Sequence, residues 1–258
     1  MTKDVVFVPK ILEDIRTDDK TRLELLLDLA EDSPLVTLAR LTRHQLIGWQ
    51  LYLFFNVTAG KDSLPNGRKL ATKADMTHFT ISSRLFLPSQ QFYILLSDVG
   101  ILFTLLALYF VAKHNGLTTM MLLYFAPYLW VHHWIVAITY LHHTHPDVPH
   151  YTAATWTFTQ GALGTIDRSF GFIGRHFFHE IIDYHLIHHL FPKIPFYHAE
   201  EATKAVMPLL GSTYVDAKQD SFLWSLYTTF RSCRFVTAEP QSKDSAASGK
   251  LVWATLVK

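Results

Sequence analysis

Residues 117–146 read LTTMMLLYFAPYLWVHHWIVAITYLHHTHP, an apolar run that ends in a cluster of histidines. A helix needs about 20 mainly apolar residues to cross the hydrocarbon core of a bilayer. The run from Leu117 to Leu141 meets that length, and its basic interruptions are His132 and His133. We therefore expect a membrane-spanning helix with histidine side chains where it emerges.

A second apolar segment, residues 94–113, precedes the first, and only HNG (114–116) separates the two. This spacing predicts a tight helical hairpin whose outer ends emerge on the same side of the membrane. Because basic residues concentrate in cytoplasmic flanks, we place both outer ends in the cytosol. The basic flanking residues are Lys61, Arg68, Lys69, Lys73, Arg84, Arg168, Arg175 and Lys193.

Polar residues interrupt a third apolar segment, at about 44–58, so we expect an interfacial or partly inserted helix there. Pro34 after Ser33 is typical of a helix start. Elsewhere the patterns predict helices at 21–32, 176–190 and 199–210, and a flexible tail at 239–258.

Composition agrees with a membrane protein. Charged residues make up 17% of the chain, against about 25% in an average soluble domain. Lys and Arg total 23 against 22 Asp and Glu, so no basic surplus indicates nucleic-acid binding. Cys233 is the single cysteine, which excludes an internal disulfide and a cysteine-based zinc site, whereas histidine occurs 15 times.

The stretch HEIIDYHLIHHL (179–190) contains the most concentrated group of histidines. His185, His188 and His189 stand at i, i+3 and i+4, which places them on one side of a helix. Neutral imidazole is a good ligand for iron or zinc, so this pattern indicates a metal site. The alternative is a polar helix side in contact with solvent.

Two carboxylates lie beside these histidines. The stretch begins like the metalloprotease motif H-E-x-x-H, but Asp183 occupies the place of the second histidine, so that interpretation fails. Asp183 and Glu180 could orient the ligand imidazoles. Simple solvent-exposed acids are an equal alternative.

A second group, His142, His143 and His145, follows the apolar run. His143 shares one stripe of the expected helix with His132, which leads us to favour His143 as a ligand. His132 is interpreted as a buried hydrogen-bonding residue, because a histidine within a spanning helix is costly unless satisfied. The predicted metal ligands are His143, His185, His188 and His189.

Several stretches together resemble the membrane fatty-acid desaturases. They are FVPK, ITYLHHTHPDVPHY, GALGTIDRSFG, FFHEIIDYHLIHHLFPKIPFYHAEEATKA and PLLG, in this order from about Val5 to about Val236. The likeness is greatest to the microsomal delta-12 (oleate) or omega-3 branch. HLIHH (185–189) resembles the third histidine box of the family, and TYLHHTHP the segment that adds a further ligand.

The resemblance implies an all-α integral membrane helical bundle with a cytosolic helical cap that carries a histidine-rich di-iron site. It implies a desaturase domain over residues 1–238, a multi-pass protein in the endoplasmic reticulum membrane, and iron facing the cytosol. The implied reaction uses O2 to introduce a cis double bond into a C18 acyl chain carried by a phospholipid or coenzyme A. The implied electron donor is a separate cytochrome b5-type protein.

One departure from the family concerns the first two histidine boxes, which should precede FVPK. Residues 1–40 contain neither. We therefore expect a fragment or truncated form with part of the di-iron site, inactive by itself. The alternative is a catalytically inactive membrane protein with the desaturase fold.

We also consider two alternative activities and the role of one charged pair. A hydroxylase or acetylenase outcome stays open within the family. A soluble zinc enzyme conflicts with the long apolar run and with the lack of H-E-x-x-H. Asp167 and Arg168 in TIDRSFG could anchor the metal helix through a charge-assisted bond, or contact a lipid headgroup or the electron donor.

Overall fold

The structure, a computed structural model, describes residues 7–12, 33–60, 64, 73–152, 154–239 and 249–254. The chain divides into two compact units. One consists mainly of Phe7–Leu41 with Ile138–Lys258, and the other mainly of Thr42–Ala137. The helix predicted at 21–32 lies outside the described residues.

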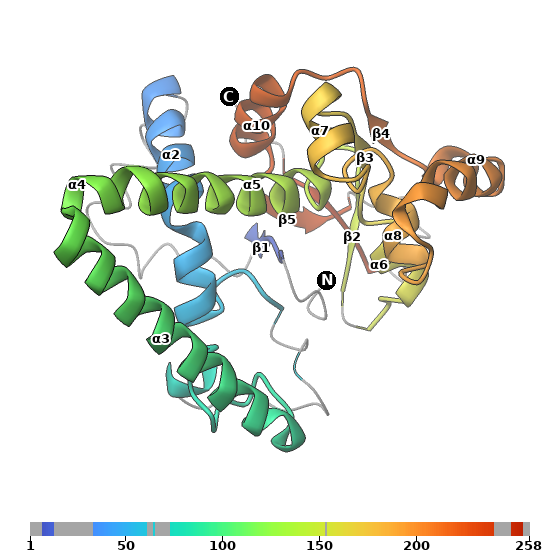
Figure 1. Cartoon of the computed structure of the whole chain (residues 1–258). Helices are drawn as coiled ribbons and strands as arrows, with labels where there is room; N and C mark the ends of the chain where they lie inside the picture. Colours follow the sequence, from blue (N-terminus) through green and yellow to red (C-terminus); the bar gives the residue numbers. More distant parts are fainter. Residues whose placement is uncertain are drawn as a thin grey trace. The chain divides into compact units, whose positions relative to one another are not determined.

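Long helices make up most of the second unit (Figure 1). Their bounds are α2 (Pro34–Phe55), α3 (Gln91–Asn115), α4 (Leu117–Met120), a π-helical turn (Met121–Phe125) and α5 (Ala126–His142), with 3-10 turns at Lys73–Met76 and Pro88–Gln90. Helix α2 begins at Pro34, as predicted. Proline suits this position because the first helical N–H groups have no partner within the helix.

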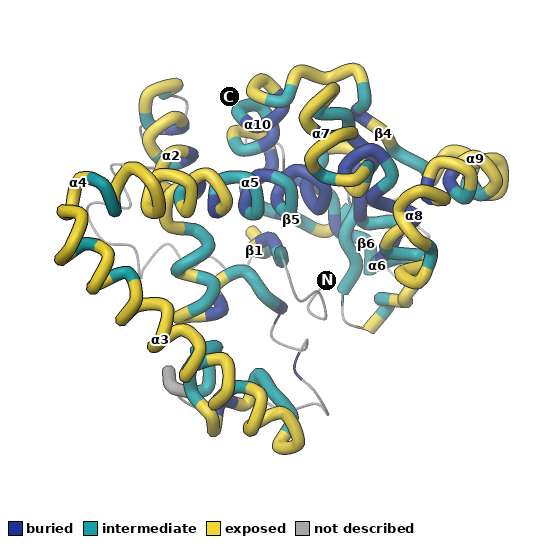
Figure 2. The backbone as a smooth tube through the Cα atoms, in the orientation of Figure 1, coloured by how far each residue is buried: buried dark blue, intermediate teal, exposed yellow. Residues whose placement is uncertain are grey.

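Two helical stretches of the described chain, Pro88–Asn115 and Leu117–His142, are long and apolar enough to cross a membrane, and α2 is not among them. They contain the predicted spans 94–113 and 117–141. Gly116 alone joins them, with a φ of 86° that glycine adopts without strain. Figure 1 shows α3 and α4 diverging from this residue, and Figure 2 shows α3 exposed along most of its length. The expected tight hairpin is thus absent among the described helices.

His132 is buried in this unit, and its Nδ1 lies 2.6 Å from the side-chain amide of Gln50. With the amide oriented so that both of its ends are satisfied, the Gln50 oxygen accepts the hydrogen bond from Nδ1. The expectation of a buried, hydrogen-bonded histidine is therefore confirmed.

The first unit combines short helices with two small sheets. Four strands pair in the order β1 (Lys10–Ile11), β5 (Phe235–Ala238), β6 (Lys250–Trp253) and β2 (His150–Tyr151), and β3 (Asp167–Arg168) pairs in parallel with β4 (Asp216–Ala217). The helices are α6 (Phe158–Ala162), α7 (Gly171–Phe177), α8 (His185–Leu190), α9 (Ala199–Leu210) and α10 (Phe222–Ser232). The all-α expectation therefore holds for most of the chain but missed both sheets.

Strand β6 corrects the prediction of a flexible tail for residues 250–253. Leu251 and Trp253 are buried, whereas Lys250 and Val252 between them are half-buried. This alternation is typical of a strand with one buried face. The buried residues pack with Val236 and Cys233 in a small hydrophobic core.

Cys233 provides a test of this core. Burial raises the pKa of its thiol to about 12, from an ordinary value of 9.0. Because the thiolate is the reactive form, we expect alkylation by iodoacetamide at pH 8 to be at least about 100-fold slower than that of a free thiol. Mass spectrometry would follow the labelling, with urea-unfolded protein as the control. Rapid labelling of the folded chain would contradict the packing of this core.

The helix predicted at 176–190 is interrupted. Helix α7 ends at Phe177 and α8 begins at His185, with a turn between them in which His179 and Glu180 have φ angles of 50° and 60°. Residues in this left-handed region cannot continue a right-handed helix. The predicted helix at 199–210 is confirmed as α9.

Candidate metal centre

Three of the four predicted ligands lie together in the first unit. The ligand atoms of His143, His185 and His189 all lie within 4.8 Å of one another. His143 directly follows α5, His185 is the first residue of α8, and His189 lies one turn further along α8. Two segments far apart in sequence therefore supply one cluster, called here the three-histidine cluster.

The spacing within the three-histidine cluster fits coordination of a single ion. Nε2 of His185 lies 3.4 Å from Nε2 of His143 and 3.0 Å from Nε2 of His189. Imidazole nitrogens bind a zinc ion at about 2.1 Å, so two on one ion lie about 3.0 Å apart at a right angle and about 3.4 Å apart at a tetrahedral angle. Both contacts of His185 match this range.

The environment of His185 keeps its ring in the form that binds metal. Its Nδ1 lies 3.2 Å from the carbonyl oxygen of Ile181. Because a carbonyl only accepts, Nδ1 carries the hydrogen and Nε2 presents its lone pair to the cluster. Burial, reinforced by the neighbouring imidazoles, holds the pKa of His185 well below its ordinary value. The ring is therefore neutral at physiological pH.

His188 is the predicted ligand that does not join this cluster. Its exposed ring is centred 6.0 Å from that of His185 and 5.6 Å from that of His189. At about 100° per residue, positions i+3 and i+4 lie on opposite sides of position i. Only one of these two side chains can face His143.

His188 lines a neighbouring cavity instead. The cavity has a volume of about 290 Å³, and its lining is mainly aromatic and aliphatic. Residues that line it include Phe178, Tyr184, His188, Phe191 and Phe196. The cavity thus has two imidazole rings in a mainly apolar lining, that of His188 from the same helix as the cluster and that of His179.

The two histidines on either side of His143, at the end of α5 and shortly after it, have different roles. The ring nitrogens of His142 lie 2.7 Å from the carbonyl oxygen of Ile138 and 3.0 Å from that of Ile182. Both nitrogens thus lie against main-chain carbonyl oxygens, to which the neutral ring can donate one hydrogen bond, and this leaves His143 as the available ligand. His145 lies 3.7 Å from the Asp147 carboxylate, outside the cluster.

Neither acid in HEIIDYH orients a ligand imidazole through a hydrogen bond in the described part of the chain. For His185 that role belongs to the main-chain carbonyl of Ile181. Asp183 is buried, and its Oδ2 has no hydrogen-bond partner among the described residues. A sequence pattern of side chains cannot reveal an orienting group that belongs to the backbone.

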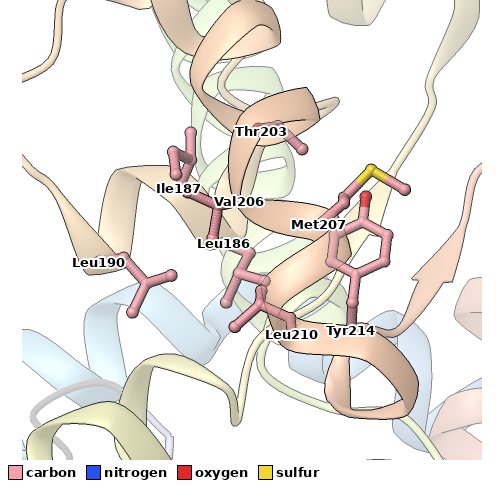
Figure 3. A pocket seen from close by; sticks show the side chains of 8 residues that line it. All are labelled: Leu186, Ile187, Leu190, Thr203, Val206, Met207, Leu210 and Tyr214. Atoms are coloured by element: carbon pink, nitrogen blue, oxygen red, sulfur yellow. The ribbon is translucent and has the colours of Figure 1, made fainter.

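Helix α8 is held from its other side by α9. Figure 3 shows the apolar side chains of Leu186, Ile187 and Leu190 lining a small pocket together with Val206 and Leu210. The histidines of α8 thus occupy the polar part of a helix whose apolar part is packed.

Comparisons with known proteins identify the family of the chain. The fatty acid desaturase family model matches residues 26–218, and the chain belongs to this family. An oleate hydroxylase from Claviceps purpurea is 40% identical over 97% of the chain. Delta-12 fatty acid desaturases from Mortierella alpina and Arabidopsis thaliana are 40% and 37% identical, each over 92% of the chain. Within the family, the chain therefore falls in the delta-12 desaturase branch.

The matches cover nearly all of this chain but a much smaller share of each relative. The chain spans 54%, 58% and 56% of the lengths of the three relatives, little more than half of each. No solved structure matches the chain.

Proposed function

We propose that this chain forms part of an acyl-lipid desaturase that introduces a cis double bond into a C18 acyl chain, at the delta-12 or omega-3 position. The observation that carries the proposal is the three-histidine cluster in a chain of the desaturase family. An oxidising metal is required because side-chain acid–base chemistry cannot break an unactivated methylene C–H bond.

The donor set fits such a metal. Three imidazoles suit iron as well as zinc, and His143, His185 and His189 would hold one iron. His188, on the same helix but turned away, would hold the second iron together with ligands supplied from outside this chain. When bound, the iron pair supplies the oxidising power for C–H cleavage with O2.

The reaction balances as follows. The acyl chain loses one hydrogen from each of two adjacent carbons, and a cytochrome b5-type donor supplies two electrons. With two protons from solvent, O2 is reduced to two molecules of water. The apolar cavity beside His188 would hold the acyl segment next to the metal and keep water from it.

The two long apolar helices fit an integral membrane protein. We propose the endoplasmic reticulum as its location, with the metal site on the cytosolic side, since curated relatives include an endoplasmic reticulum omega-6 desaturase from Brassica juncea. The oleate hydroxylase relative makes hydroxylation a second candidate outcome.

A chimaera tests the proposal. The host is yeast that makes oleate but no dienes. There these 258 residues alone should yield no new fatty acid, because a complete iron pair needs ligands in addition to the three-histidine cluster and His188. Joined to the part of the Mortierella alpina desaturase that lies outside the match, the chain should yield a dienoic acid measurable by gas chromatography. A 12-hydroxy acid would indicate the hydroxylase.

Two outcomes would contradict this account. A diene from the 258 residues alone would show that the site is complete without further ligands. A folded, iron-loaded chimaera without any product would favour the non-catalytic alternative.

A further inference from the structure

Strand β3 consists of two charged residues, Asp167 and Arg168, whose side chains are almost completely buried at 0% and 2% exposure. Buried charges are costly unless hydrogen-bonded. Successive side chains of a strand point to opposite sides, so the two residues can serve different segments. Their burial removes the possibility that they contact a lipid headgroup or an electron donor directly.

Arg168 binds the end of α5. Its Nε donates to the carbonyl oxygen of Leu141 at 2.9 Å, and its Nη2 donates to that of Thr144 at 3.4 Å. The last carbonyls of a helix have no partner within it, and a cation there is favourable. Burial lowers the pKa of Arg168 to about 10, so the guanidinium stays charged at neutral pH. The two carbonyls flank His143.

Asp167 binds the start of α8. Its Oδ1 accepts a hydrogen bond from the backbone N–H of Leu186 at 2.9 Å, in the manner of a helix N-cap. Its Oδ2 accepts from the Tyr214 hydroxyl at 2.7 Å and lies 3.7 Å from Nζ of Lys218. Burial raises the pKa of the Asp167 carboxyl, and these donors oppose that rise. The bonded N–H directly follows His185.

The backbone of residues 166–168 makes the same two connections. The N–H of Ile166 donates to the carbonyl oxygen of His142 at 3.0 Å, and the N–H of Arg168 donates to that of Ile182 at 3.1 Å. Side chains and backbone of residues 166–168 therefore join the segment that carries His143 to the segment that carries His185.

We propose that Asp167 and Arg168 are positioning residues that set the separation of His143 from His185 and His189, and thereby the metal affinity of the three-histidine cluster. This inference rests on the proposed metal-binding function. Removing a group that orients metal ligands typically weakens binding by about 10–100-fold. A buried pair that served stability alone would lower the melting temperature without changing the affinity of the folded protein.

Co2+ titration of the 258-residue chain in detergent micelles, followed by visible absorption, tests the proposal. We expect Asp167→Ala to weaken Co2+ binding by about 10–100-fold. Asp167→Asn should restore most of the affinity, because its amide oxygen can still accept from the Leu186 N–H. Arg168→Lys should also weaken binding, because an ammonium cannot span both carbonyls as the guanidinium fork does.

The matched control is Glu201→Gln, which removes an exposed carboxylate that lies 3.3 Å from Nδ1 of His198. It should leave Co2+ affinity unchanged. If Asp167→Ala does not fold, the Co2+ affinities of Asp167→Asn, Arg168→Lys and the parent still show whether the two residues position the metal ligands. Unchanged Co2+ affinity and spectrum in Arg168→Lys, with a lowered melting temperature, would overturn the positioning role while leaving the metal site intact. A parent chain that binds no Co2+ would overturn both the metal site and this inference.

Discussion

Replacing His185 with alanine should abolish high-affinity Co2+ binding by this chain. Its Nε2 is the nitrogen that lies close to both other ligands, at 3.4 Å from His143 and 3.0 Å from His189. Loss of a ligand should exceed the effect of losing an orienting group, so we expect a decrease of more than about 100-fold. Isothermal titration calorimetry in detergent would measure it.

His198→Ala is the matched control for this variant. His198 is exposed, lies 3.3 Å from the Glu201 carboxylate and is outside the three-histidine cluster. Its substitution should leave the affinity unchanged. If His185→Ala bound Co2+ as tightly as His198→Ala, the cluster would not be the metal site.

His188→Ala should separate the two proposed iron positions. In the 258-residue chain it should leave Co2+ affinity nearly unchanged, because His188 is not part of the three-histidine cluster. In the active chimaera it should eliminate the dienoic product, because the second iron would lose its ligand from this chain. Co2+ titration of the 258-residue variant and gas chromatography of the lipids made by the chimaera provide the two readouts.

The opposite pattern would contradict this assignment. Full activity of the His188→Ala chimaera would show that His188 is not a ligand. A large loss of Co2+ affinity in the 258-residue variant would place His188 in the same coordination sphere as His185.

Much of the helical framework follows from simple patterns in the sequence. The apolar lengths of residues 94–113 and 117–141 predict α3 and α5, and Pro34 predicts the start of α2. The small sheets could not be predicted in this way, because their strands have only two or four residues, too few for a clear periodicity. Strand β6 was missed because KLVW directly follows a long polar segment, whose composition led to the prediction of a flexible tail.

The sequence predicts which residue type supplies the ligands, but not which of the predicted histidines come together. Spacing alone puts His185, His188 and His189 on one side of a helix, yet only two of them face His143. The turn at His179 and Glu180 also shortens the expected helix, and neither residue is a glycine that would signal it. The connections made by Asp167 and Arg168 depend on main-chain groups brought together by the fold, which no local pattern encodes.

The most direct test of the metal centre is X-ray absorption spectroscopy of the purified chain loaded with one equivalent of Co2+. The account predicts a first shell that includes three imidazole nitrogens at about 2.1 Å, with the outer-shell scattering typical of histidine rings. In His185→Ala this histidine signal should decrease. A first shell of oxygen atoms alone in the parent chain would contradict the account.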